Sequence, residues 1–213
     1  MRLLRVATFN IKHGQGPDQR VDLKRLGEAC ARLDADVLGL QEVDIEQARS
    51  HGADLVDVVA AATQMHGTFG LAATMGGGLY GNALLSRDAL TEVETVPLPG
   101  TGERRSVLLA STSGVSVAVT HLSVSNQHTR QVPAVLAALA ERPAPRLLMG
   151  DFNHEWPDLP GYALAGGGPT FPSGVAERRI DHIAVDGLRV VSTTVVQLDV
   201  SDHRALVATL TTA

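Results

Sequence analysis

Residues 145–153 read PRLLMGDFN, a short apolar run that ends in an aspartate and an asparagine. This composition predicts a buried β-strand with Asp151 and Asn153 at its end. The same pattern recurs along the chain: an apolar, strand-like segment ends at, contains or begins with an acid, an amide or an imidazole. The other residues in such positions are Asn10, Glu42, His121, Asp181, Asp202 and His203. Side chains at strand ends of layered α/β domains meet at one rim of the sheet, where ligands bind, so we expect these residues to gather there.

The remaining sequence alternates strand-like and helix-like segments without a composition break, which predicts one α/β domain over residues 1–213. Helical spacing of apolar residues predicts helices over 21–33, 53–64 and 126–141. In the third helix Asn126 is the expected N-cap, and Pro133 predicts a late start or a kink. Further strands are expected in 3–10, in 36–42, in several segments of 67–121 and in three segments after residue 177, with irregular loops at 11–20 and 155–175.

Composition excludes several classes of protein. The chain has 44% hydrophobic and 19% charged residues, which excludes a disordered polymer. No apolar run approaches the roughly 18 residues of a membrane helix, and the opening MRLLRVATFN has no signal-peptide pattern, so we expect a cytoplasmic protein. Cys30 is the only cysteine, which excludes an internal disulfide. A net charge of −5 and 3% aromatic residues argue against an extended basic or base-stacking surface for nucleic acid.

The residue types at the strand ends indicate a particular chemistry. Carboxylate and amide oxygens suit Mg²⁺ or Mn²⁺. The sequence lacks the pair of cysteines or closely spaced histidines that would point to zinc. Carboxylates repel a phosphate until a metal ion is bound, so the ion would supply the attraction that the net charge does not. A histidine can then donate to a phosphoryl oxygen or the leaving group, while an Asp–Asn pair holds the attacking water. The set therefore predicts metal-assisted hydrolysis of a phosphoester. The sequence does not lead us to predict a protein partner.

The order of the motifs resembles the endonuclease/exonuclease/phosphatase superfamily, in particular its DNase I-like and sphingomyelinase-like metal-dependent hydrolases. The motifs are TFNI (8–11), LQE (40–42), GNALLS (81–86), ERR (103–105), THL (120–122), GDFN (150–153), IDHI (180–183) and SDHRA (201–205). The resemblance covers nearly the whole chain. It implies a four-layer α/β sandwich, in which two mixed β-sheets pack face to face with helices outside and the active site lies along one edge.

The resemblance also implies roles for individual residues. As metal ligands it implies Asn10, Glu42 and Asp202, and as substrate-binding residues Asn82 and Arg105. As catalytic residues it implies His121, Asp151, Asn153, Asp181 and His203. Strand register decides whether Arg104 or Arg105 faces the site, and His182 is expected to be a packing residue.

The chain is short for this family, with compact loops between the motifs. Together with its acidic charge this favours a small or lipid-derived phosphoester as substrate, and DNA is the second candidate. A non-catalytic binding module is a third hypothesis, which the complete set of motif residues disfavours. Arg49, His13 and His154 lie in loops that could line the site or simply face solvent. Trp156, in the loop over 155–175, belongs either to a small apolar lip or to an ordered surface loop.

Overall fold

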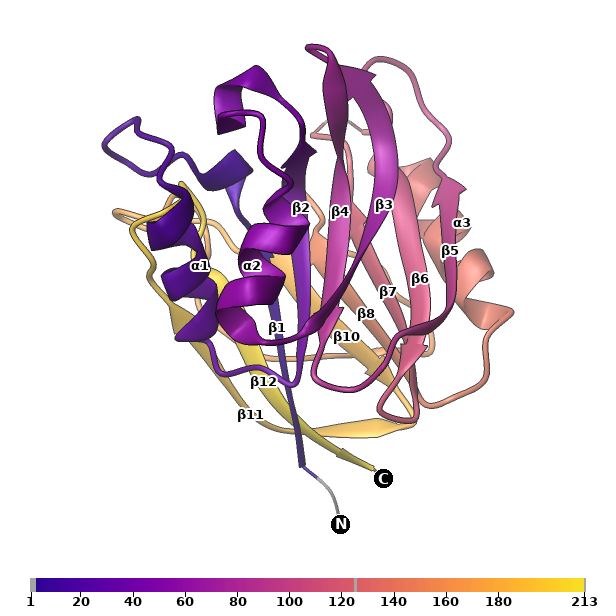
Figure 1. The fold of residues 1–213 in the computed structure, drawn as a ribbon. Coiled ribbons are helices and arrows are strands. Elements are labelled where there is room, and N and C mark those ends of the chain that lie inside the picture. The colour runs from indigo at the N-terminus through magenta and orange to yellow at the C-terminus, as the bar shows by residue number, and fades with distance from the viewer. Residues whose placement is uncertain (1–2, 125, 213) are drawn as a thin grey trace.

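The structure is a computed structural model that describes residues 3–124 and 126–212. Its strands form two mixed sheets (Figure 1). The strands of the first sheet are β1 (Leu3–Asn10), β2 (Val37–Ile45), β3 (His66–Met75), β4 (Gly78–Ser86), β11 (Leu188–Val196) and β12 (Ala205–Thr212). Those of the second are β5 (Thr91–Pro97), β6 (Ser106–Thr112), β7 (Val115–His121), β8 (Arg146–Asp151), β9 (Ala163–Leu164) and β10 (Asp181–Asp186). The strand orders are β11-β12-β1-β2-β4-β3 and β5-β6-β7-β8-β10-β9.

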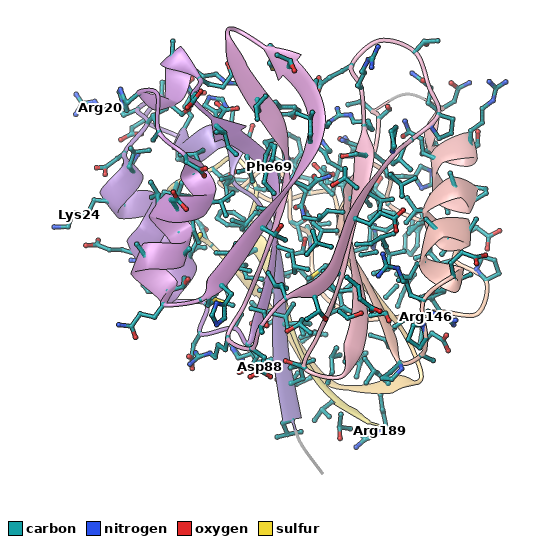
Figure 2. The ribbon with its side chains drawn as sticks, turned by 45° about the vertical axis from the view of Figure 1, so that its right-hand side comes forward. Arg20, Lys24, Phe69, Asp88, Arg146 and Arg189 are labelled. Carbon is teal, nitrogen blue, oxygen red and sulfur yellow. The ribbon has the colours of Figure 1, made fainter. Side chains whose placement is uncertain are left out.

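The helices cover the outer faces of the two sheets. Helices α1 (Leu23–Ala31) and α2 (Leu55–Thr63) pack on the first sheet, and α3 (His128–Ala140) packs on the second. Figure 2 shows α1 and α2 on one side of the paired sheets and α3 on the other, with Lys24 of α1 pointing away from them. The predicted four-layer α/β sandwich is confirmed.

The start of the third helix differs from the expectation. Helix α3 begins at His128, and its N-cap is Gln127 rather than Asn126. The carbonyl of Asn126 instead accepts a hydrogen bond from the Thr129 hydroxyl, at 2.8 Å. The helix begins only two residues after Asn126, and Pro133 is its sixth residue, so the late start that Pro133 predicts does not occur. The predicted irregular loop over 155–175 holds one short strand, β9.

Alternation of side chains along the strands divides the apolar residues between three layers of core. Val119 of β7 and Met149 of β8 point between the two sheets, whereas their neighbours Ala118 and Leu148 point toward α3. This period of two is the strand pattern that the sequence predicts. His121 and Asp151 continue the inward-pointing series by one more step, beyond the end of the core.

Each sheet contains a parallel pair at its centre. Strands β1 and β2 run parallel, as do β7 and β8, and a helix connects each pair. Neighbours in a parallel pair end at the same edge, so β1, β7 and β8 carry their last residues to the rim of the sandwich. This rim lies at the end of the molecule opposite the start of β1 (Figure 1).

Candidate active site

Strand register places the predicted residues side by side on both sheets. On the second sheet Asp151 of β8 pairs directly with His121 of β7 and with Asp181 of β10. On the first sheet Asn10 of β1 pairs with Gln41, the neighbour of Glu42 on β2. The register therefore gathers an amide, an imidazole and three carboxylates at one rim.

A β-bulge directs Glu42. The pairing of β2 with β4 shifts register between Leu40 and Val43, and Glu42 has a φ of 57°. Non-glycine residues rarely adopt a positive φ, and such strain is concentrated at functional sites. The bulge changes the alternation of the strand and leaves Glu42 beside Asn10.

The gathered side chains surround a polar cavity of about 360 Å³. Seven of the predicted residues line it, namely Glu42, Arg105, His121, Asp151, Asn153, Asp202 and His203. The three other predicted residues, Asn10, Asp181 and Asn82, are buried and lie behind the lining. Arg105 is the inward-facing arginine, because it is buried whereas Arg104 is exposed.

The amide of Asn10 joins two of the carboxylates. Its Nδ2 donates to Glu42 Oε1 at 3.0 Å and to Asp151 Oδ2 at 2.9 Å. Its Oδ1 accepts the backbone N–H of Lys12 at 3.0 Å. In this orientation the amide holds the carboxylates in place with its N–H groups, while its oxygen is directed elsewhere.

His203 lies between two buried carboxylates. Its Nδ1 is 2.9 Å from Asp181 Oδ2, and its Nε2 is 3.6 Å from Asp151 Oδ2. Burial by itself lowers the pKa of His203, but the charges of Asp181, Asp151 and Asp202 outweigh it and raise the pKa to about 10. Burial and the charge of Asp181 raise the pKa of Asp151 to about 7. The site therefore favours an imidazolium at His203 near neutral pH.

His121 has the opposite environment. The Arg105 guanidinium donates to its Nδ1 at 2.7 Å, and the Tyr80 hydroxyl lies 3.5 Å from the same nitrogen. Because a guanidinium can only donate, Nδ1 must be unprotonated and the ring proton must sit on Nε2. That Nε2–H faces the acceptor Asp151 Oδ2 at 3.5 Å. Asn153 Nδ2, which is 3.1 Å from the same nitrogen, is itself a donor, to the carbonyl of Leu122, and does not accept this proton. Burial and the charges of Arg105 and His203 hold the pKa of His121 well below its usual value.

These environments predict that, at pH 8 in the EDTA-treated protein, one buried imidazole carries a positive charge and two others are neutral. We expect His203 to be protonated on both nitrogens, and His121 and His182 to be neutral, since burial lowers the pKa of His182 to about 4. Nitrogen-15 NMR of the imidazole rings, assigned with single His→Gln variants, distinguishes these states. A neutral His203 ring at pH 8 would contradict the electrostatic description of the site.

Asp202, which lines the cavity, forms an ion pair with Lys12. The Lys12 ammonium lies 2.7 Å from Asp202 Oδ2, and the Asp202 side chain is 38% exposed. Asn82 lies deeper: its Nδ2 donates to the carbonyl of Ser106 at 3.0 Å, next in sequence to Arg105. Its expected contact with substrate stays a prediction, and its observed hydrogen bond supports the backbone beside Arg105.

The donor set fits a hard divalent cation. Asp151, Asp181 and His203 place possible ligand atoms within 4.8 Å of one another, and with His203 held as an imidazolium the two carboxylates are the donors among them. Asp181 Oδ1 is buried without a hydrogen-bond partner among the described residues. Asp151 is costly to ionise in this environment, and a nearby cation would reverse that cost. The cavity also offers Glu42 and Asp202, so oxygen donors of the kind that Mg²⁺ and Mn²⁺ prefer are present on two sides.

Residues outside the predicted catalytic and ligand set also contribute to the site. Tyr80 lines the cavity, and its place two residues before Asn82 on β4 is a signal that strand alternation could have supplied. Arg49, one of the uncertain loop residues, lines the cavity and forms a two-pronged ion pair with the buried Asp44, at 2.8 and 2.7 Å. No periodic signal marks Lys12.

A two-sheet α/β sandwich with carboxylates, amides and imidazoles around one rim cavity defines a hydrolase of the DNase I-like class. The chain belongs to the Endonuclease/Exonuclease/phosphatase family, whose sequence model matches residues 7–203. Members of this family are hydrolases that depend on divalent metal ions. A comparison with curated proteins finds no significant match.

Solved structures share the fold over the whole chain. An endonuclease/exonuclease/phosphatase from Beutenbergia cavernae is 28% identical, with a TM-score of 0.84 over 100% of this chain and 72% of that one. A conserved protein of unknown function from Enterococcus faecalis is 22% identical, with a TM-score of 0.76 over 99% and 100% of the two chains. D. rerio TDP2, complexed with a single-strand DNA product, is 19% identical, with a TM-score of 0.76 over 100% of both chains. The described residues contain no helix long and apolar enough to cross a membrane.

Proposed function

We propose that this hydrolase cleaves a P–O bond of a phosphoester by in-line attack of water, with Mg²⁺ or Mn²⁺ as its cofactor. The observation that carries the proposal is the geometry of Asp151. Its Oδ2 is approached by the amide of Asn10 and by imidazole nitrogens of His121 and His203, all at the wall of one polar cavity. Such an arrangement combines a proton acceptor with groups that donate hydrogen bonds to a phosphoryl oxygen.

In the proposed mechanism Asp151 orients the attacking water and accepts its proton. A carboxylate with a pKa near 7 is a suitable general base at neutral pH. The backbone N–H of Asn153 donates to Asp151 Oδ1 at 2.8 Å and fixes the carboxylate. The Asn153 side chain donates to the carbonyl of Leu122 at 2.9 Å, so this loop is held beside the water position.

The two imidazoles serve the phosphoryl group in different ways. His203, held as an imidazolium by Asp181, donates a charged hydrogen bond to a phosphoryl oxygen as negative charge develops in the transition state. His121, held as a neutral ring by Arg105, donates from Nε2. Arg105 places a second fixed positive charge at the same wall, 2.7 Å from that ring.

The proposed ligands of the metal ion are Glu42 and Asp202, with Asn10 keeping Glu42 in position. Asn10 remains a ligand only if its amide turns to present Oδ1, which now accepts the N–H of Lys12. When bound, the ion neutralises phosphate charge and polarises the ester. Lys12 would exchange its ion pair with Asp202 for a contact with substrate or solvent.

A small or lipid-derived phosphoester is the proposed substrate. The chain carries a net charge of −5, and positive charge at the cavity is confined to a few residues, including Arg49 and Arg105. DNA is the second candidate, because a solved structure with the same fold, D. rerio TDP2, is complexed with a single-strand DNA product. Whether the substrate is a monoester or a diester is decided by the following experiment.

The proposal is tested by a panel of nucleotides, sugar and inositol phosphates, phospholipid headgroups and supercoiled plasmid, each with Mg²⁺, Mn²⁺ or EDTA. We expect metal-dependent release of alcohol or phosphate from a small or lipid-derived ester and little plasmid nicking. Nicking at rates comparable with the best small substrate would favour the nuclease. Absence of turnover on every substrate would favour the non-catalytic binding module.

Glu42→Ala is expected mainly to weaken the dependence on metal. The variant removes a carboxylate that the bulge in β2 directs at the cavity, so half-maximal activity should require about tenfold or more added Mn²⁺. Activity measured across a Mn²⁺ titration gives this value, and Glu28→Ala on the exposed face of α1 is the matched control. A Mn²⁺ requirement equal to that of wild type would remove Glu42 from the ligand set.

A further inference from the structure

A second cavity, which we call the α3 groove, lies between α3 and residues 156–160. Its volume is about 370 Å³, and most of its lining is apolar. Leu122, Phe152 and Leu136 contribute to the lining, and Trp156 stands beside it with 84% of its surface exposed. An indole so exposed in a groove of apolar side chains is typical of a ligand site.

The groove and the catalytic cavity share a thin wall. His121 and Asp151 line the catalytic cavity, whereas the residues next to them in sequence, Leu122 and Phe152, line the groove. Successive side chains of an extended chain point to opposite sides, so the wall is one backbone layer thick. A substrate whose phosphate occupies the catalytic cavity can therefore extend over this wall into the groove.

Hydrogen bonds and ring packing hold the segment around His154 and Trp156, which lines the groove. His182 Nε2 bonds to the carbonyl of His154 at 2.8 Å, and the backbone N–H of Trp156 donates to His154 Nδ1 at 3.2 Å. The imidazole of His154 packs against that of His128 on α3, with centroids 4.2 Å apart. The groove is thus preformed, which reduces the entropic cost of binding.

We propose that the α3 groove binds the hydrocarbon part of the substrate's ester group. The inference rests on the proposed function and narrows it to phosphoesters of an apolar alcohol. The groove lining contains Asp158 and, among its described residues, no lysine or arginine. A polynucleotide continuing into it would meet a carboxylate instead of the cations that phosphates require. An uncharged hydrocarbon chain meets a lining that is mostly apolar there.

The single tryptophan of the chain gives a direct binding signal. Because Trp156 is exposed, its emission should shift to shorter wavelength when a hydrocarbon chain covers it. Monomeric octyl phosphate is expected to produce a saturable shift, whereas methyl phosphate at the same concentration should produce none. A shift seen only with lipid vesicles, or no shift at all, would overturn the assignment of the groove.

Two matched variants on α3 test the location. Thr129→Phe fills the groove from an exposed position, and Ala137→Phe adds the same side chain to an exposed position outside it. Octyl phosphate should bind about tenfold or more weakly to Thr129→Phe and normally to Ala137→Phe. Equal binding by both variants would contradict the proposal.

Hydrolysis connects the groove to catalysis. With Mn²⁺, wild type should cleave the p-nitrophenyl octyl phosphodiester with a kcat/KM about tenfold or more above that of the methyl diester. Thr129→Phe should lose this preference, whereas Ala137→Phe should keep it. Turnover of the methyl diester without an octyl preference would overturn the proposed role of the groove and leave the proposed function standing. No turnover of either diester with Mg²⁺ or Mn²⁺ would contradict the proposed function and the substrate role of the groove with it.

Discussion

Asp151→Asn is expected to lower kcat for phosphoester hydrolysis by about 10²-fold or more, because it removes the proposed general base. The change is nearly isosteric, but it replaces an acceptor with a group that can also donate. The amide would then face the N–H groups of Asn10 and Asn153, which now hold the carboxylate at 2.9 and 2.8 Å. The measurement is kcat at saturating Mn²⁺ with bis(p-nitrophenyl) phosphate.

The loss should be catalytic rather than structural. Burial already raises the pKa of Asp151 to about 7, so replacing it with a neutral side chain removes a group that is costly to bury as an anion. We therefore expect the urea midpoint of Asp151→Asn to be at least as high as that of wild type. Asp57→Asn, on the exposed face of α2, is the control for the chemical change. A wild-type kcat in Asp151→Asn would show that another group activates the water.

His203→Ala is expected to lower kcat by about 10²-fold or more as well, since it removes a charged donor aimed at the phosphoryl group. The ring is fixed by Asp181 through Nδ1 and packs against Phe171, with ring centroids 4.9 Å apart. Because these contacts orient Nε2 toward the cavity, kcat should fall more than KM rises. Wild-type kinetics in this variant would remove the proposed role of His203.

The pH profile tests how Asp181 acts through this ring. Asp181 raises the pKa of His203, and the protonated ring is the form that donates. In Asp181→Asn the pKa of His203 falls, so activity should be lost at lower pH on the alkaline side than in wild type. An unchanged alkaline limb together with reduced kcat would indicate a purely structural role for Asp181.

The alternation of side chains along the strands predicts much of the site from sequence. Because inward-facing residues alternate, Val119 and Met149 in the core predict that His121 and Asp151 point to the same side one step further on. The pairing of β7 with β8 then places these two residues opposite each other. The resemblance to the family added the expectation of two face-to-face sheets, which periodicity alone does not provide.

Other features depend on geometry that the sequence does not encode locally. The bulge that directs Glu42 is a shift in the pairing of β2 with β4, and the residue types at 41–43 do not predict it. The ion pair of Lys12 with Asp202 joins residues 190 positions apart. The charge states of His121 and His203 depend on which neighbours, Arg105 or Asp181, the fold brings to each Nδ1.

The central claim is that one rim cavity uses a divalent cation and its own carboxylates and imidazoles to split a P–O bond with water. It is tested most directly by hydrolysis of bis(p-nitrophenyl) phosphate with Mn²⁺ in ¹⁸O-labelled water. The account predicts EDTA-sensitive turnover with the label in the phosphate product. Label in the nitrophenol, or turnover that persists after complete removal of metal, would contradict it.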